Sequence, residues 1–467
     1  MHFLHPSSRT PSRLTLLVGC FVAALCALLA TVGADADWLS ALGRDVAHSW
    51  SIPGGVPFAA VSSDGWHNVP VLGELVFHAL QAGLGARGLV LAQVVAVVAC
   101  LTLVSVDMRR GGVPDAPAAL VLILTAFAAA AALLVVRSQL FSLALFPLLV
   151  LLLRSEARTP SRRIWLLVPL VALWSNLHGG VLLGVAVAGV YLVFERARSQ
   201  AWTAVGVLAG MALALFATPA LVETAAYYHG VLGSRAATQG EGLWRPLSLH
   251  APFDVVFLVV ALPLLFLALR SRPRLWETIA IVGLAIAAVR SSRNEVWLAL
   301  FIALPAARTL AGSRQWRVTL SPLVAGAVAA LLAAVAVAGL ARTPMSSGAT
   351  PTLLERAAVA ARGTPILADG VDAEQLALAG HRILIGNPLD AFPLREQQRY
   401  LDWLAGRPAG DVEVSRVRVV MATVGSAAQK RLGRRSDFVE TARDKRVVIY
   451  VRSDVHGWDT HAPRNPG

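Results

Sequence analysis

The chain has 467 residues, of which 56% are hydrophobic and only 15% are charged, and its mean hydropathy is +0.63. This composition is too apolar for a soluble globular protein and is typical of a polytopic membrane protein. The formal charge of +13 does not indicate nucleic-acid binding, because the arginines occur in short clusters between apolar runs, where the positive-inside preference explains them.

Eleven apolar runs predict membrane-spanning helices. In chain order they are 14–34, 88–106, 118–136, 140–153, 164–175, 179–194, 201–219, 253–269, 275–289, 296–307 and 322–340. Several contain only about 12–15 apolar residues, fewer than the ~20 that a full crossing needs, so these must include flanking polar residues or cross where the bilayer is thinned. The first run follows a basic N-terminus and is long enough to be an uncleaved helix rather than a signal peptide.

The segment 35–78 separates the first two runs and is predicted to be a large polar loop at one membrane face. Its acidic, amide and imidazole side chains include Asp35, Asp37, Asp64, His67, Asn68 and Glu74. Near its end, residues 69–84 place apolar side chains at helical spacing with polar ones between them. We therefore expect an interfacial or re-entrant helix there rather than a further span.

Alternating the spans from a cytoplasmic N-terminus puts the arginine clusters of all inside connections on the cytoplasmic face. The opposite face then receives the polar segments 35–78, 137–139, 176–178, 223–254 and 290–295. Polar and ionisable groups at membrane depth are candidates for function. We therefore expect a site on the extracytoplasmic face.

The composition after residue 342 changes to that of a soluble domain. Residues 343–351 are predicted to be a linker, residues 352–452 a small extracytoplasmic α/β domain, and residues 453–467 a disordered tail. Short β-branched runs alternate with helical ones in this domain, which favours a largely parallel sheet. It contains no evident catalytic group, so acceptor binding, partner contact or stabilisation of the outer face is expected of it.

The motifs DxDW, WSIPGGVPF, GWHN, LGELVFHAL, RSQLFSLALF, WSNLHGG and RSSRN, spread over residues 14–310, resemble those of bacterial multi-pass proteins of the glycosyltransferase-C superfamily. The phrase ILIGNPLDAFPLREQQRYLDWLAG near the C-terminus is also similar to that group, without an assigned role. The resemblance implies a polyprenyl-phosphate-sugar donor, an inverting transfer in the outer leaflet and a loop carboxylate as the base. On this sequence that base is Asp35 or Asp37.

The chemistry of the two carboxylates leaves alternatives open. Asp35 or Asp37 can act as a general base that deprotonates an acceptor hydroxyl, helped by the other carboxylate or by a divalent cation. Both can instead be ordinary acidic residues at a helix end. His67 and His178 are possible metal ligands, but no metal-binding spacing joins them, and hydrogen bonds to sugar or phosphate are the favoured interpretation.

The remaining predicted substrate-binding residues lie in the other outer segments. They are Arg137, Gln139, Asn176, His178, Trp244, Arg290 and Arg293. The glycines after His178 favour a tight hairpin that presents Asn176 and His178 to an outer cavity, and Trp244 offers a flat surface for a sugar. Arginine on the outer face needs an anionic partner, which is a donor phosphate or, alternatively, Glu295 or a lipid headgroup.

The leading hypothesis is an integral membrane glycosyltransferase with an α-helical, glycosyltransferase-C-like fold. It would move a sugar from a polyprenyl-phosphate carrier to a cell-envelope glycan, lipid or protein. A transporter or flippase of lipid-linked substrates and a non-catalytic scaffold are the alternatives. The transporter is disfavoured because the polar residues gather at one face and the chain has no internal repeat.

Overall fold

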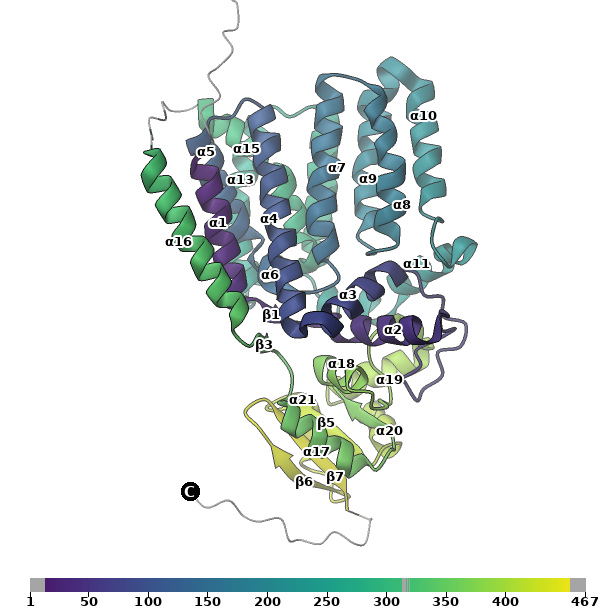
Figure 1. The fold of residues 1–467 in the computed structure, drawn as a ribbon. Coiled ribbons are helices and arrows are strands. Elements are labelled where there is room, and N and C mark those ends of the chain that lie inside the picture. Colours follow the sequence, from purple (N-terminus) through teal and green to yellow (C-terminus); the bar gives the residue numbers. More distant parts are fainter. Residues whose placement is uncertain (1–12, 313–315, 317, 319, 454–467) are drawn as a thin grey trace, which may run out of the picture.

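The computed structural model of the chain describes residues 13–312, 316, 318 and 320–453. It consists of a helical bundle and a small C-terminal domain that lies at one end of the bundle (Figure 1). The helices α2 (Ala36–Ser49) and α3 (Val71–Leu84) lie across this end, between the bundle and the domain. Segments that are far apart in the sequence therefore meet there.

The bundle is built from twelve of the described helices. They are α1 (Arg13–Leu29), α4 (Ala86–Arg110), α5 (Asp115–Ala128), α6 (Ala130–Leu134), α7 (Leu140–Arg158), α8 (Leu167–Ser175), α9 (Val181–Tyr191), α10 (Ala197–Ala214), α13 (Pro252–Arg270), α14 (Leu275–Arg290), α15 (Glu295–Gly312) and α16 (Pro322–Ala341). Two short helices, α11 (Thr224–Gly233) and α12 (Arg235–Gln239), connect α10 to α13.

Five helical stretches in the described part of the chain are long and apolar enough to cross a membrane. They are α4, α7, α13, α16 and the stretch Ser292–Gly312 that contains α15. The helices α1, α3 and α5 are apolar but shorter. Length and composition thus support a multi-pass membrane protein but do not establish the predicted number of 11 spans.

Two of the predicted spans end earlier than expected, because each runs into a short strand. The run 14–34 leaves the helix at Leu29 and continues as β1 (Thr31–Val32), and the run 118–136 divides into α5 and α6 and ends in β2 (Val135–Val136). A third strand, β3 (Met345–Ser346), comes from the predicted linker, and the three pair in parallel in the order β2-β1-β3. Apolar composition alone cannot distinguish such β-branched helix ends from continued helix.

The predicted polar loop 35–78 is also corrected, because it contains α2. Trp38, Leu39, Leu42 and Val46 are buried along one side of this helix, while charged residues occupy the other. The predicted helix at 69–84 is confirmed as α3. The two helices cross closely at Gly43, where a Cβ atom would lie 2.1 Å from the Glu74 carbonyl oxygen, so only glycine fits.

At the end of the bundle opposite to the C-terminal domain, two arginines that the topology argument counted as cytoplasmic are buried in ion pairs. The Arg154 guanidinium donates to Asp107 at 2.7 Å and to Glu277 at 3.0 Å. Arg196 lies 3.5 Å from Glu156. These pairs join α7 to α4 and α14 and hold the bundle together, since a buried charge without a partner would be strongly destabilising.

The C-terminal domain contains α17 (Pro351–Ala361), β4 (Ile366–Ala368), α18 (Gly370–Leu378), α19 (Leu394–Leu404), α20 (Asp411–Ser415), β5 (Val419–Thr423), α21 (Ala427–Leu432), β6 (Phe438–Arg443) and β7 (Val447–Arg452). Its sheet has the order β4-β5-β7-β6. Only β4 and β5 are parallel, so the prediction of a largely parallel sheet is wrong. The cause is the hairpin of β6 and β7, in which β6 is a mostly exposed edge strand with a polar sequence. The predicted disordered tail lies outside the described residues after Ser453.

Candidate active site

The parallel strands at the end of α1 bring Asp35 close to Arg137. Val32 is paired with Val136, and the Gly33 N–H donates to the Val136 carbonyl oxygen at 3.2 Å. A Cβ atom on Gly33 would lie 2.4 Å from Val135 Cγ1 and 3.7 Å from Arg137 Nε, so the close approach requires glycine. Asp35, two residues further on, interacts electrostatically with the Arg137 guanidinium.

The backbone of Asp35 has an uncommon conformation and an unusual partner. Its φ of 81° lies in the left-handed region, which costs a non-glycine residue about 1–2 kcal/mol unless its surroundings compensate. The Asp35 N–H donates to Glu374 Oε2 of the C-terminal domain at 2.9 Å. The Asp35 carboxylate accepts a hydrogen bond from Trp38 Nε1 at 3.3 Å.

A cavity of about 210 Å³ opens at this end of the bundle, and two arginines without carboxylate partners line it. Its walls include Arg137, Gln139 and Arg293, together with apolar residues of α5 and α6. The Arg293 guanidinium lies 4.4 Å above the Trp244 ring, and Gln139 donates to the Arg293 carbonyl oxygen at 3.1 Å. Arg293 therefore has a fixed position at the cavity wall.

The charge on these two arginines is not neutralised by a close ion pair. Among the described residues, no carboxylate lies within 4.0 Å of either guanidinium, and the buried Arg137 Nε has no hydrogen-bond partner. The Asp35 carboxylate interacts electrostatically with both guanidinium groups, and Glu374 also interacts with Arg137. Arg245 in the same cavity, by contrast, donates to both oxygens of Asp254 at 2.6 and 2.7 Å. Arg137 and Arg293 are thus available to an anion.

The C-terminal domain adds further polar groups to the neighbourhood of Asp35. Glu374 accepts from Asn387 Nδ2 at 2.7 Å, and Asp390 accepts from Trp66 Nε1 at 3.3 Å. Burial raises the pKa of Asp390 to about 6. The Trp66 ring in turn lies 6.4 Å from the Tyr227 ring, so an aromatic pair borders the carboxylates.

Two predicted site residues form a buried pair beneath this region. The Asn68 Nδ2 donates to Glu74 Oε2 at 2.7 Å, and neither side chain is accessible to solvent. Burial raises the pKa of Glu74 to about 8, and the hydrogen bond from Asn68 opposes part of that rise. Glu74 interacts electrostatically with Tyr227 of the aromatic pair. Neither Asn68 nor Glu74 is among the residues that line the cavity.

The hairpin between α8 and α9 places His178 near Arg293. The Ser142 hydroxyl accepts from Trp174 Nε1 at 2.7 Å and lies 2.7 Å from His178 Nδ1, which also accepts from the Gly180 N–H at 3.2 Å. Burial, with a smaller effect of Arg293, lowers the pKa of His178 to about 3. A neutral imidazole in this arrangement carries its proton on Nε2 and can donate one hydrogen bond.

The other predicted residues lie elsewhere. Asn176 donates to the carbonyl oxygens of Ala172 and Ala217 and so joins the ends of α8 and α10. Asp64 is exposed and accepts from Ser62, His67 lies 3.8 Å from Glu223, and Arg290 is exposed outside the cavity.

Asp37 differs from Asp35, since it is only 6% exposed and belongs to the first turn of α2. Burial raises the pKa of Asp37 to about 6. Among the described residues, no group of three or more His, Cys, Asp or Glu side chains has an arrangement that holds a metal ion. The two predicted histidines are separated, His67 beside Glu223 and His178 beside Ser142.

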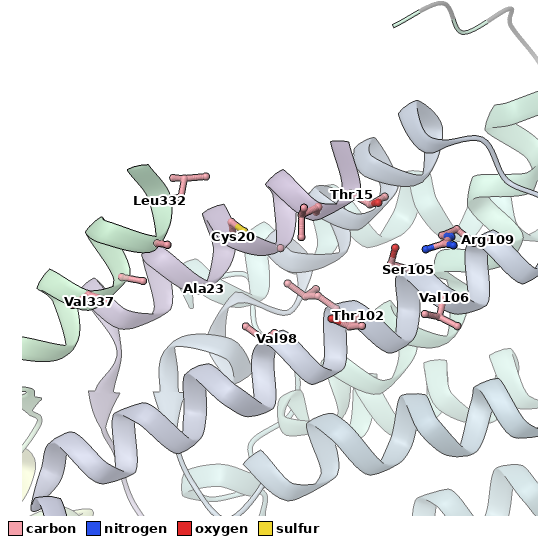
Figure 2. Close-up of a pocket in the computed structure, with 15 residues that line it drawn as sticks. Thr15, Cys20, Ala23, Val98, Thr102, Ser105, Val106, Arg109, Leu332 and Val337 are labelled. Carbon is pink, nitrogen blue, oxygen red and sulfur yellow. The ribbon is translucent and has the colours of Figure 1, made fainter. Parts of the chain in front are cut away.

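A larger cavity, of about 470 Å³, lies between α1, α4 and α16 (Figure 2). Its walls are mainly apolar, with Arg109, Thr15 and Ser105 gathered at one end. No acidic side chain among the described residues lines it. The residues of α1 that line it run from Thr15 to Ala23, whereas Asp35 follows the other end of this helix. It therefore offers no group for acid–base chemistry.

Comparison with solved structures finds chains with a similar fold. ArnT from Cupriavidus metallidurans in the apo state is similar over 94% of this chain and 97% of that chain, with a TM-score of 0.52 and 15% identity. The mycobacterial arabinofuranosyltransferase AftD is similar over 95% of this chain and 42% of that chain, also with a TM-score of 0.52 and 15% identity. The chain has the glycosyltransferase-C fold. A second structure of the same ArnT, bound to undecaprenyl phosphate, has a TM-score of 0.48 and 16% identity over 93% of this chain and 96% of that chain. No protein-family model and no curated protein sequence matches the chain.

Sequence reasoning missed the contribution of the C-terminal domain to the surroundings of Asp35. Glu374 accepts from the Asp35 N–H, Asn387 donates to Glu374, and Asp390 interacts electrostatically with Asp35, although the domain was expected to lack catalytic groups. The phrase IGNPLD contained a usable signal, because Asn387 and Asp390 interrupt an apolar run without helical or strand periodicity. Glu374 had no such signal, since it looks like an ordinary acidic residue of an amphipathic helix.

Proposed function

We propose that this chain is an integral membrane glycosyltransferase that uses a polyprenyl-phosphate-linked sugar as donor and a component of the cell envelope as acceptor. The observation that carries the proposal is the position of Asp35 beside Arg137 and Arg293, two guanidinium groups without a close carboxylate at the wall of a cavity. A base and an anion site side by side are what sugar transfer from a lipid phosphate requires. The glycosyltransferase-C fold supports the same class of reaction.

In the proposed reaction the Asp35 carboxylate accepts the proton of an acceptor hydroxyl. The hydroxyl oxygen forms a bond to the anomeric carbon of the sugar as the bond from that carbon to the phosphate oxygen breaks. The electron pair of the broken bond stays on the phosphate, which leaves as polyprenyl phosphate with one additional negative charge. Arg137 and Arg293 stabilise this developing charge, and His178 Nε2 supplies a neutral hydrogen-bond donor near Arg293.

The sugar is proposed to lie against the aromatic pair of Trp66 and Tyr227. Flat aromatic rings pack against the apolar faces of sugars, while carboxylates such as Asp390 accept hydrogen bonds from sugar hydroxyls. The five apolar helical stretches place the chain in the bilayer. Arg109, Arg158 and Arg270 lie at helix ends away from this site, which favours an extracytoplasmic position for the site and for the C-terminal domain.

The proposal is tested by glycan profiling of the cell envelope in a deletion strain. We expect loss of one sugar from an envelope component and accumulation of the corresponding polyprenyl-phosphate-linked sugar. Complementation with the wild-type gene or with Asp45→Asn is expected to restore the profile. Asp45 is a matched control because it is a carboxylate of the same helix α2 that pairs with Arg44 away from the cavity. Complementation with Asp35→Asn is expected to fail although the protein is present in the membrane.

Full restoration by Asp35→Asn would refute the role of Asp35. An unchanged glycan profile in the deletion strain, with no accumulated donor, would refute the proposed activity. Accumulation of donor on the cytoplasmic face alone would instead identify a transporter of the lipid-linked sugar.

A further inference from the structure

The backbone of Asp35 is held from the C-terminal domain and not from the bundle. Its N–H donates to Glu374 Oε2 at 2.9 Å across 339 positions of sequence. Although Asp35 precedes the first turn of α2, its own side chain makes no capping hydrogen bond to that helix. The main chain of Asp35, with its left-handed φ of 81°, has two hydrogen-bond partners: its carbonyl oxygen accepts from the Leu39 N–H of α2 at 3.3 Å, and its N–H donates to Glu374.

The Glu374 carboxylate is buried and bridges Asp35 to Asn387. Its side chain is only 1% exposed, and each carboxylate oxygen has one partner, the Asp35 N–H on Oε2 and Asn387 Nδ2 on Oε1. No arginine, lysine or histidine among the described residues forms an ion pair with it. Burial and the nearby Asp35 carboxylate raise the pKa of Glu374 well above its ordinary value. A buried acid without a close ion pair is unfavourable for stability, which points to a functional reason for its presence.

Hydrogen bonds between the C-terminal domain and the region of α2 bring Glu374 to Asp35. The loop after α2 forms an isolated β-bridge to the domain, in which the Ala60 N–H donates to the Ile383 carbonyl at 2.9 Å and the Val61 N–H to the Leu384 carbonyl at 3.0 Å. Arg44 of α2 donates to the Leu378 carbonyl at the end of α18, the helix that carries Glu374, at 2.7 Å. These hydrogen bonds hold the domain against α2 and the loop that follows it.

We propose that Glu374 is a positioning residue, which holds Asp35 in the conformation that directs its carboxylate toward Arg137, Arg293 and the acceptor. The C-terminal domain then completes the active site rather than only stabilising the outer face. This inference rests on the proposed function, in which Asp35 is the base. Because Glu374 acts through the backbone of Asp35, its loss should lower the rate of transfer without weakening donor binding.

The first test compares Glu374→Ala and Glu374→Gln with the control Asp372→Ala. Asp372 is a buried carboxylate of the same helix, and it accepts from the Ala349 N–H at 2.7 Å instead of from the Asp35 N–H. Transfer is measured with the purified full chain, using donor lipid extracted from the deletion strain. We expect kcat to fall about 10–100-fold in Glu374→Ala with KM for the donor unchanged.

The Gln variant distinguishes positioning from charge. Its amide oxygen can still accept from the Asp35 N–H if the Asn387 amide turns to present its oxygen to the new NH₂ group. We therefore expect Glu374→Gln to recover most of kcat. Equal losses in Glu374→Ala and Asp372→Ala would overturn the proposal, because the effect would then be one of domain stability.

The second test does not depend on activity. Hydrogen–deuterium exchange of the peptide 31–40 reports the protection of the Asp35 amide. We expect faster exchange in this peptide in Glu374→Ala but not in Asp372→Ala, and unchanged exchange would overturn the positioning role. If exchange is faster in Glu374→Ala but the wild-type chain transfers no sugar from any donor, the contact between Glu374 and Asp35 is supported and the proposed function is refuted.

Discussion

The role of Arg293 can be tested by replacing it and measuring the affinity for a polyprenyl phosphate without a sugar. Arg293 lines the cavity beside Arg137 and is held by its stack on Trp244, whereas Arg290, three positions earlier, is exposed outside the cavity. The sequence alone assigned both arginines the same role. Of Arg290 and Arg293, the structure predicts that only Arg293 contacts the phosphate.

The size of the expected effect follows from the contacts. A hydrogen bond to a charged group contributes about 1.5–3 kcal/mol, and each 1.4 kcal/mol is a factor of ten in Kd. Arg293→Ala removes such a bond while Arg137 remains, so the Kd should rise about 10–150-fold. Arg293→Lys keeps the charge but loses the planar fork that stacks on Trp244, and a loss of about 1 kcal/mol, or about 5-fold, is expected. Arg290→Ala should change the Kd by less than about 2-fold.

Binding is measured by titrating the lipid into the full chain in nanodiscs, at two salt concentrations. A site inside the cavity should be less sensitive to salt than a headgroup contact at the membrane surface. Unchanged affinity in Arg293→Ala, or a larger loss in Arg290→Ala, would refute the assignment of the cavity as the phosphate site.

Three further outcomes are expected. Asp35→Asn should lower transfer about 10²–10⁴-fold while the protein keeps its melting temperature, because the change removes a base and preserves shape; near wild-type turnover would exclude Asp35 as the base. Burial raises the pKa of Asp37 from 3.8 to about 6, so its contribution to stability is full below pH 3.8 and is lost as pH rises through about 6. The melting temperature of Asp37→Asn should therefore exceed that of the wild type more at pH 7.5 than at pH 4.5, and an equal difference at both would contradict the burial argument. Reporter fusions at Gly111, next to the end of α4, and at Gly348, after β3, should report opposite compartments, and a cytoplasmic signal from Gly348 would invert the topology.

Apolar runs predicted much of the helical structure of this molecule correctly. Residues 69–84 form α3 because their apolar side chains recur at helical spacing. Asp35 and Asp37 were both named as candidates because carboxylates at the end of an apolar helix are costly unless they have a function, and the base role of either one stays a prediction. These are local properties, since periodicity, burial cost and the charge of a side chain can be read from neighbouring residues.

The tertiary structure decided which of these side chains share a site. The parallel pairing of β1 and β2 joins Asp35 to Arg137 across about 100 positions, and no local pattern specifies that register. Docking of the C-terminal domain then brings Glu374 to the Asp35 N–H, a contact between segments 339 positions apart. Arg290 and Arg293 were equivalent in sequence but diverge in space, because the chain turns between α14 and α15 and directs only Arg293 into the cavity. Long-range pairing and chain direction depend on the whole fold, and for that reason the composition of the site could not be read from the sequence.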